Sequence, residues 1–260
     1  MLPKISVLFI TYNRLVTLKP TLEAFLANTD FPRDRLELIV CDDCSPPAVQ
    51  DEIRRMPFDL QCLAAKRGGL GANVNQGLKA ASGQLILQMQ DDWECLGPPD
   101  YLRRAAAALK AAPDVGMVIL NQHPMPLNVR RLQSFDGGAL RIYDNRPDTP
   151  VNMVGEHAYT DWPHLKRRSF HDTLGLYQEG TPMWEAELEF SRRVNEQTRT
   201  FIADIEGMNV FEHIGAEHSF NTGSKKARLA KKISSYPGGA AAIDAYSWLK
   251  RAISRRKPSV

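Results

Sequence analysis

The sequence has no long hydrophobic run and only a few cysteines. None of its apolar stretches approaches the roughly 18 to 20 residues that a helix needs to cross a bilayer. The four cysteines, at positions 41, 44, 62 and 95, lack the pattern of a secreted disulfide framework. The first residues, 1–4, lead directly into a strand-like run, so we expect no signal peptide. Together these features predict a protein of the reducing cytoplasm.

Two nucleotide-binding motifs and a zinc motif are also missing. The glycine-rich stretch 68–71 does not end in the Lys-Ser or Lys-Thr pair of a P-loop. Nor does it follow the first predicted strand at the spacing of a dinucleotide fingerprint. Cys41 and Cys44 have the spacing of half a zinc site, but no second pair follows them. The composition, 43% hydrophobic and 24% charged, is that of an ordinary folded domain.

Charge is distributed unevenly along the chain. Residues 222–260 contain ten Lys or Arg and one acid, so the rest of the chain is acidic although the whole carries +3. Apolar residues recur at helical spacing beside these basic residues, which predicts a basic helical tail over 222–260. Such a tail either is a solvated end or docks on an anionic membrane surface or an acidic partner. Nucleic acid is not an expected partner, because the rest of the chain is acidic.

Apolar strand-like runs alternate with helix-like stretches through the first 120 residues. The runs are 5–10, 36–41, 85–87 and 115–120, and the helical stretches are 15–27, 71–81 and 101–112. Continuous apolar strands indicate a sheet that is buried on both faces, and such sheets are parallel. The sequence therefore predicts an α/β fold with a doubly wound, mostly parallel sheet and helices on both faces.

The second part of the chain is patterned differently. Proline and glycine punctuate residues 121–180, which predicts a loop-rich insertion rather than a separate domain. A helix from about 183 to 196 is expected next, because Thr181-Pro182 is a helix-start signal. Strands near 201–205 and 209–213 are expected after it.

Polar and acidic residues follow the predicted strands at the point where each one ends. The carboxyl ends of parallel strands meet at one edge of a sheet, and ligands bind there. The residues at these positions are Thr11-Tyr12-Asn13-Arg14, Asp42-Asp43, the stretch 66–75 after a short strand expected near Cys62, and Asp91-Asp92. Adjacent carboxylates repel each other unless a cation compensates them, and hard divalent cations bind carboxylate and phosphate oxygens. Asp91-Asp92 is thus a predicted metal site for a phosphate-bearing ligand.

Four motifs of the first half resemble those of the family 2 glycosyltransferases, which have the GT-A fold. They are ISVLFITYNR at 5–14, LIVCDDCS at 38–45, RGGLGANVNQGLKAASG at 67–83 and LILQMQDD at 85–92. The resemblance is strong over residues 4–120, the nucleotide-binding half, and loose beyond it. It implies one glycosyltransferase domain over 1–221, with the acceptor and catalytic residues in 121–221 and the tail in 222–260.

The resemblance implies a nucleotide site at the ends of the first two strands. Thr11, Tyr12 and Arg14 would border the nucleotide, with Tyr12 packing near the base. Asp43 would accept a hydrogen bond from the base, which is typically uracil in this family.

It also implies a diphosphate and metal site beside the nucleotide. Arg67 and Asn75 would line the path of the nucleotide and its diphosphate. Asp91 would contact the ribose or the donor sugar, and Asp92 would hold Mn²⁺ or Mg²⁺ bridging the diphosphate. The acidic motif of the family often begins with Asp, whereas this chain has Gln90 there.

Inverting glycosyl transfer needs a carboxylate that takes the proton of the acceptor hydroxyl. The family places this base at the start of a helix, and the segment 183–190 fits that position. Glu185 lies in the first predicted turn, where the helix dipole favours a carboxylate. Glu187 has the spacing to Arg193 that the family's acid shows, so both glutamates remain candidates. His213 resembles the family's late histidine, which binds the metal or contacts the diphosphate.

The expected function is an inverting, metal-dependent transfer of a sugar from a nucleotide diphosphate, UDP first, to an acceptor hydroxyl. The acceptor would be a saccharide or glycolipid in polysaccharide or glycolipid assembly, with the protein in the cytoplasm or peripheral on the cytoplasmic membrane face. A degenerate sugar-nucleotide-binding or partner-docking protein is one alternative, which Gln90 and the incomplete Glu-Asp motif support. A nucleotidyltransferase is the other, although only Arg14 supplies a basic residue after the first strand.

Overall fold

The structure is a computed structural model that describes residues 2–123, 127–148 and 157–215. Up to Gly215 the chain forms one compact unit. The predicted basic helical tail, 222–260, and its docking surface lie outside the described residues, so they stay predictions. No helix of the described residues is long and apolar enough to cross a membrane.

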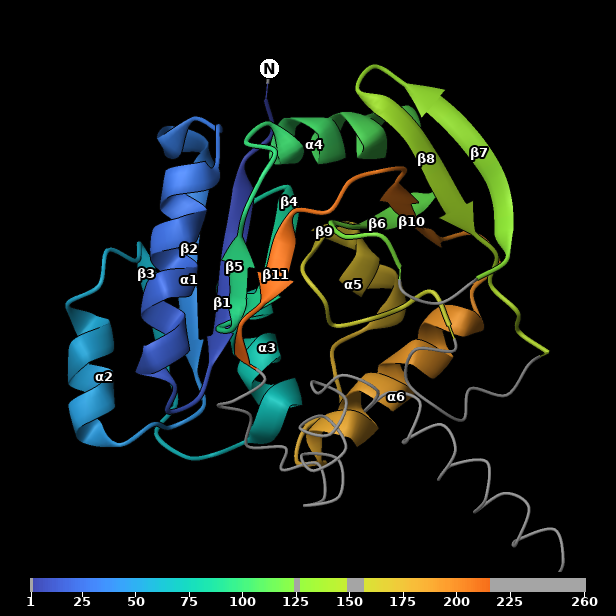
Figure 1. Cartoon of the computed structure of the whole chain (residues 1–260). Helices are drawn as coiled ribbons and strands as arrows, with labels where there is room; N and C mark the ends of the chain where they lie inside the picture. Colours follow the sequence, from blue (N-terminus) through green and yellow to red (C-terminus); the bar gives the residue numbers. More distant parts are fainter. Residues whose placement is uncertain (1, 124–126, 149–156, 216–260) are drawn as a thin grey trace, which may run out of the picture. The chain divides into compact units, whose positions relative to one another are not determined.

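Within the described residues, nine strands form one sheet in the order β3-β2-β1-β4-β9-β6-β10-β8-β7 (Figure 1). The strands are β1 (Ile5–Thr11), β2 (Leu36–Asp42), β3 (Leu60–Leu63), β4 (Leu85–Gln90), β6 (Val115–Ile119), β7 (Val129–Phe135), β8 (Gly138–Tyr143), β9 (His164–Arg167) and β10 (Phe201–Ile205). Seven of them run in one direction, and β8 and β9 run against it. The predicted mostly parallel sheet is therefore confirmed.

Helices cover both faces of this sheet (Figure 1). They are α1 (Leu15–Asn28), α2 (Pro47–Arg54), α3 (Gly69–Ala80), α4 (Tyr101–Ala111), α5 (Ser169–Leu174) and α6 (Met183–Asn195). Apolar side chains of α1, α2 and α4 belong to one hydrophobic cluster, and those of α3, α5 and α6 belong to another. The doubly wound arrangement is confirmed by this division.

Strand β1 shows why an unbroken apolar run is needed at the centre of the sheet. Every residue of the strand is buried. Val7 and Phe9 pack into the cluster beneath α1 and α4, whereas Leu8 and Ile10 pack into the cluster beneath α3. Successive side chains of a strand point to opposite faces of the sheet. Because helices cover both faces here, odd and even positions of the strand are both buried and both favour apolar residues.

The middle of the chain contains more regular structure than its sequence predicted. Three strands, β7, β8 and β9, and helix α5 lie within residues 121–180. Strand β9 enters the sheet between β4 and β6, antiparallel to both. Its sequence, His-Leu-Lys-Arg, has one apolar residue in four, so hydrophobic patterning could not find it. Two shorter strands, β5 (Trp93–Cys95) and β11 (Phe211–His213), pair separately as a small antiparallel sheet.

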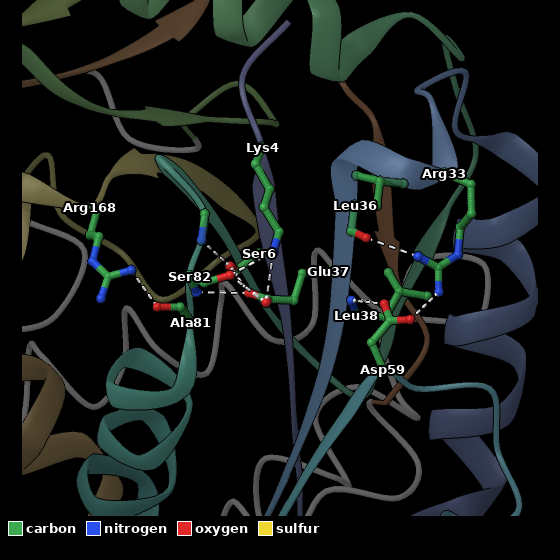
Figure 2. Close-up of polar contacts among 11 residues, drawn as sticks. Lys4, Ser6, Arg33, Leu36, Glu37, Leu38, Asp59, Ala81, Ser82 and Arg168 are labelled. Atoms are coloured by element: carbon green, nitrogen blue, oxygen red, sulfur yellow. Dashed lines mark hydrogen bonds and ion pairs between the residues drawn. The ribbon is translucent and has the colours of Figure 1, made fainter.

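Glu37 forms hydrogen bonds that link the segments where β1, β2 and β4 begin (Figure 2). Its carboxylate accepts hydrogen bonds from Ser6 Oγ at 2.5 Å, from Ser82 N at 2.8 Å and from Lys4 Nζ at 3.1 Å. Burial acts to raise the pKa of Glu37, but these hydrogen bonds outweigh it and lower the pKa to about 2. The same figure shows Asp59 joining the Leu38 N–H to Arg33. These contacts lie at the opposite end of the strands from the candidate site.

Candidate active site

The ends of β1, β2 and β4 meet at one edge of the sheet, as predicted. The β1 register pairs Thr11 with Asp42 on one side and Ile10 with Gln90 on the other, so Asp91 follows directly beside Thr11. Thr11 Oγ1 donates to Asp91 Oδ2 at 2.6 Å, and the Asp91 N–H donates to the Ile10 carbonyl at 3.0 Å. This pairing fixes one carboxylate at the sheet edge.

Arg14 joins the two adjacent carboxylates. Its Nη1 lies 3.1 Å from Asp91 Oδ1, and its Nη2 lies 2.7 Å from Asp92 Oδ2. His213 Nε2, from β11, lies 3.1 Å from the same Asp92 oxygen. A Cβ atom built on Gly215 would overlap both Asp92 and Arg14, so the chain passes this cluster at a position that only glycine can fill. Sequence reasoning named Arg14, Asp91, Asp92 and His213 but did not pair Arg14 with the acids.

The two carboxylates of this cluster differ in their affinity for protons. Burial raises the pKa of Asp91 to about 7, although Arg14 and Thr11 oppose the shift. Burial acts to raise the pKa of Asp92 as well, but His213 and Arg14 outweigh it and lower that pKa. Asp92 is therefore the carboxylate that remains charged at neutral pH, as a metal ligand must.

Asp92 has a free oxygen that could bind a divalent cation beside His213. Asp92 Oδ1 is buried and makes no hydrogen bond, so this oxygen is available as a ligand. The described residues contain no group of three or more His, Cys, Asp or Glu placed to hold a metal. A bound cation would therefore need further ligands, and diphosphate oxygens are suitable ones.

Tyr12, Asp43 and Arg67 lie together at the ends of β1 and β2. The Arg67 guanidinium carbon lies 3.9 Å from the centroid of the Tyr12 ring, and Arg67 Nε lies 3.6 Å from Asp43 Oδ2. Asp43 Oδ1 accepts from the Gly68 N–H at 2.7 Å, and Asp43 Oδ2 accepts from the Gly69 N–H at 3.1 Å. The predicted base-binding residues are thus neighbours, and the turn before α3 holds the Asp43 carboxylate in place.

The neighbouring Asp42 has a different surrounding. Its Oδ2 accepts from the Ser45 N–H at 2.8 Å and from Gln50 Nε2 at 2.9 Å, and the Ser45 hydroxyl donates to Oδ1. These contacts hold the turn between β2 and α2. Of the two acids in the Asp42-Asp43 pair, Asp42 therefore stabilises the local fold of this turn.

Asn75, predicted to line the diphosphate path, contacts the segment before α6. Its Oδ1 accepts from the Tyr177 N–H at 3.0 Å, and its Nδ2 donates to the Tyr177 carbonyl at 2.9 Å and to Glu179 Oε1 at 2.8 Å. The side chain is 1% exposed. These contacts fasten α3 to the segment before α6, and a place for Asn75 beside the diphosphate stays a prediction.

The two candidate bases on α6 are placed differently. Glu187 is half-buried, and its Oε1 accepts from the Asp161 N–H at 3.2 Å. Burial and the charge of Asp161 raise the pKa of Glu187 to about 8. Glu185 lies in the first turn of α6 and is half-buried. Glu187 therefore has the environment of a carboxylate that binds a proton tightly.

A row of rings connects the Asp161 segment with the metal candidates. The Trp162 and Trp93 ring centroids are 5.4 Å apart, and those of Trp93 and His213 are 5.1 Å apart. His213 in turn contacts Asp92. The base candidate and the predicted donor site are thus parts of one continuous region.

Sequence reasoning missed Asp161 and Lys166, which are buried beside Glu187 and on β9 respectively. Neither residue belongs to a motif, and a buried lysine has no signature in a single sequence. Only the unusual polarity of the His-Leu-Lys-Arg strand could have pointed to them.

The comparison with family models identifies the class. The model described as "Glycosyl transferase family 2" matches residues 6–174, which is more than half of the chain. The chain therefore belongs to this family. The match extends the resemblance seen in the sequence through β9 and α5.

Curated relatives and solved structures agree with this assignment. The protein named "Putative glycosyltransferase EpsH" of Bacillus subtilis (strain 168) is 29% identical over 174 residues, 64% of this chain and 48% of the relative. The poly(ribitol-phosphate) beta-N-acetylglucosaminyltransferase TarS of Staphylococcus aureus (strain Mu50 / ATCC 700699) is 32% identical over 93 residues, 34% of this chain and 16% of TarS. This chain thus spans about half the length of the first relative and less of the second.

The fold is shared with S. aureus TarS residues 1–349, solved in complex with UDP-GlcNAc. The TM-score is 0.57 at 19% identity, and the match covers 82% of this chain and 61% of the other. At that identity the likeness establishes the fold, which is the GT-A type expected from the sequence.

Proposed function

We propose that this protein transfers a sugar from a nucleotide diphosphate to an acceptor hydroxyl with inversion of the anomeric centre. The observation that carries the proposal is the cluster of Arg14, Asp91, Asp92 and His213 at the ends of β1, β4 and β11. The names of the relatives EpsH and TarS support the same activity.

UDP is the proposed nucleotide. An Asp43 carboxylate oxygen can accept from the N3–H of uracil, whereas cytosine has no hydrogen on that atom. The Tyr12 ring offers a face for the base, and the Arg67 guanidinium that lies over it in this structure would move to the nucleotide or its phosphates. Thr11 and Asp91 are proposed to border the ribose and the donor sugar. The complexes of S. aureus TarS with UDP-GlcNAc and with UDP support this choice.

Asp92 and His213 are the residues that would hold Mn²⁺ or Mg²⁺. The buried Asp92 Oδ1 is the open position, and imidazole nitrogen suits Mn²⁺ better than Mg²⁺. A bound cation would neutralise charge on the departing diphosphate. A mannosyltransferase of Pyrobaculum calidifontis, solved with GDP-Man and Mn²⁺, has the same fold with a TM-score of 0.50 at 20% identity.

Glu187 is the proposed general base. Its carboxylate would take the proton of the acceptor hydroxyl while that oxygen attacks the anomeric carbon opposite the diphosphate. The raised pKa of Glu187 gives it a stronger affinity for this proton than an ordinary glutamate has. Glu185, the other candidate, is proposed to border the acceptor instead. Residues 121–221 are accordingly the proposed acceptor and catalytic half of a domain over 1–221.

The proposed acceptor is a saccharide or a glycolipid, and the proposed role is polysaccharide or glycolipid assembly. The basic tail, 222–260, is proposed to bring the protein to the anionic cytoplasmic face of a membrane. A protein that only binds sugar nucleotides would retain the donor site and release no product.

The test is release of nucleoside diphosphate from a panel of UDP- and GDP-sugars, with Mn²⁺ and a panel of saccharide acceptors. The proposal expects acceptor-dependent release with one donor, and its loss in Glu187→Gln. Tight donor binding without release from any donor would instead support the binding protein.

A further inference from the structure

A cluster of polar side chains is buried next to Glu187. Asp161 and Lys166 are 4% and 0% exposed, which is rare for either residue type. The other members are Gln88, Tyr159 and Tyr177. They come from β4, from β9 and from the segments that precede β9 and α6. Nothing in the donor site requires this cluster, so its position beside the proposed base needs a separate explanation.

The hydrogen bonds of the cluster converge on one oxygen of Asp161. Tyr177 donates to Asp161 Oδ1 at 3.2 Å, and the Tyr159 hydroxyl donates to the same atom. Gln88 Nε2 lies 3.5 Å from that oxygen. Lys166 Nζ donates to Gln88 Oε1 at 2.7 Å, which orients the Gln88 amide toward Asp161. The carboxylate is thus held by donors from three directions.

The same contacts determine the charges near Glu187. Burial raises the pKa of Asp161, and the tyrosine hydroxyls and Lys166 oppose the rise. Burial lowers the pKa of Lys166 to about 7, and Asp161 opposes that fall. Burial and Lys166 lower the pKa values of His164 and His171, so both rings are neutral at pH 7.

Arg193 of α6 is engaged away from Glu187. Arg193 Nη2 donates to the Leu176 carbonyl at 2.8 Å and pairs with Glu189 Oε2 at 2.7 Å. Asp161 is accordingly the carboxylate whose charge acts on Glu187.

We propose that Asp161 is a positioning residue for Glu187, and that Gln88, Lys166 and the two tyrosines hold it in that role. The Asp161 N–H orients the Glu187 carboxylate through Oε1, which leaves Oε2 for the acceptor hydroxyl. A charged Asp161 repels the Glu187 charge and so favours the protonated form that transfer produces. This inference rests on the proposed function, in which Glu187 accepts the proton.

The test follows the Glu187 carboxyl itself and needs no activity. In protein labelled with ¹³C at the glutamate side-chain carboxyl, Glu187→Gln identifies the resonance by removing it. The midpoint in the unaltered protein is expected at about pH 8. In Asp161→Asn it is expected about one pH unit lower, since one like charge is removed. Glu196→Gln, an exposed position after the same helix, serves as the matched control and leaves the midpoint unchanged.

Two outcomes would overturn the inference, and they are distinguishable. An unchanged Glu187 midpoint in folded Asp161→Asn shows that Asp161 is only structural, and leaves the proposed function standing. Sugar transfer at the normal rate by Glu187→Gln removes the proposed base, and the positioning role with it. Asp161→Ser removes the same charge and replaces Asp161→Asn if that variant does not fold.

Discussion

Arg14 Nη2 lies 2.7 Å from Asp92 Oδ2, and the pair joins the end of β1 to the residue that follows β4. Both side chains are largely removed from solvent, at 13% and 3% exposed. The guanidinium also reaches Asp91, so one cation compensates two adjacent buried carboxylates. Arg14, together with the His213 contact to Asp92, therefore stabilises this acidic sheet edge.

Arg14→Gln is expected to destabilise the protein because it removes the arginine partner of the buried Asp92 carboxylate. Breaking a buried ion pair costs about 3–5 kcal/mol. Mn²⁺ should restore part of this loss, so the variant should gain more in melting temperature from Mn²⁺ than the unaltered protein does. Thermal unfolding with and without Mn²⁺ measures both effects. Arg54→Gln, at an exposed ion pair with Asp51, is the control and should change neither. Equal gains from Mn²⁺ in both proteins would contradict this interpretation.

Asp43→Asn is expected to reduce the preference for UDP over CDP by about tenfold, which corresponds to about 1.4 kcal/mol. A carboxylate accepts the uracil N3–H and repels the cytosine N3 lone pair, whereas an amide can serve either base. Competition binding of the two diphosphates gives the ratio directly. Because Asp43 also holds the Gly68 and Gly69 amides, a uniform loss of affinity for both would show a structural effect alone.

Sugar transfer should increase with pH, reach half its maximum near pH 8 and level off about one pH unit higher. The active form of Glu187 is deprotonated, and its pKa is raised to about 8, so the competent fraction grows through that range. Glu187→Gln should lower the rate by about 10²–10⁴. Glu185→Gln should leave more than a tenth of the rate, and Glu196→Gln should leave it unchanged. The profile is measured as kcat against pH at saturating donor. A profile that is flat between pH 6 and 9 would exclude Glu187 as the base.

Glu37→Gln is expected to lower stability without affecting the site. The Glu37 carboxylate receives bonds from Ser6, Ser82 and Lys4, and a lost hydrogen bond to a charged group costs about 1.5–3 kcal/mol. The pKa of Glu37 is lowered to about 2, so its contribution is complete above the ordinary pKa and disappears as pH falls from about 4.5 to 2. Denaturant unfolding at pH 7 and at pH 2 should show a difference between the two proteins only at the higher pH. Unchanged nucleotide affinity would confirm that the effect is confined to stability.

The sequence predicted the parts of the fold that depend on apolar strands. The runs of β1, β2, β4 and β6 are mostly apolar, and those of β1, β2 and β4 are followed by the polar residues that meet at the sheet edge. Strand β9 was missed because it has few apolar side chains. Its buried polar residues are stabilised by specific partners, as Lys166 is by its hydrogen bond to Gln88.

The site residues could be predicted where polar or acidic side chains directly follow a strand. Contacts between residues far apart in the sequence were harder to predict. Asp92 and His213 are 121 positions apart; Asp92 was singled out as an acid that follows a strand, and His213 through its resemblance to the family's late histidine. The hydrogen-bond partners of Asn75 lie 102 and 104 positions away in the sequence, and no local sequence pattern predicts them. Arg14 was expected to border the nucleotide, and its pairing with two carboxylates depends on the register of β1 against β4.

The most direct test of the donor site is a thermal-shift titration with UDP, GDP, CDP and dTDP, each with and without Mn²⁺. Ligand at about one hundred times its Kd stabilises the native state by about 2.7 kcal/mol, which corresponds to a shift of about 5 °C or more for a domain of this size. The proposal predicts that UDP gives such a shift, that the shift requires Mn²⁺, and that Asp92→Asn abolishes it while Asp51→Asn does not. No shift with any diphosphate, in well-folded protein, would contradict the assignment of the donor site.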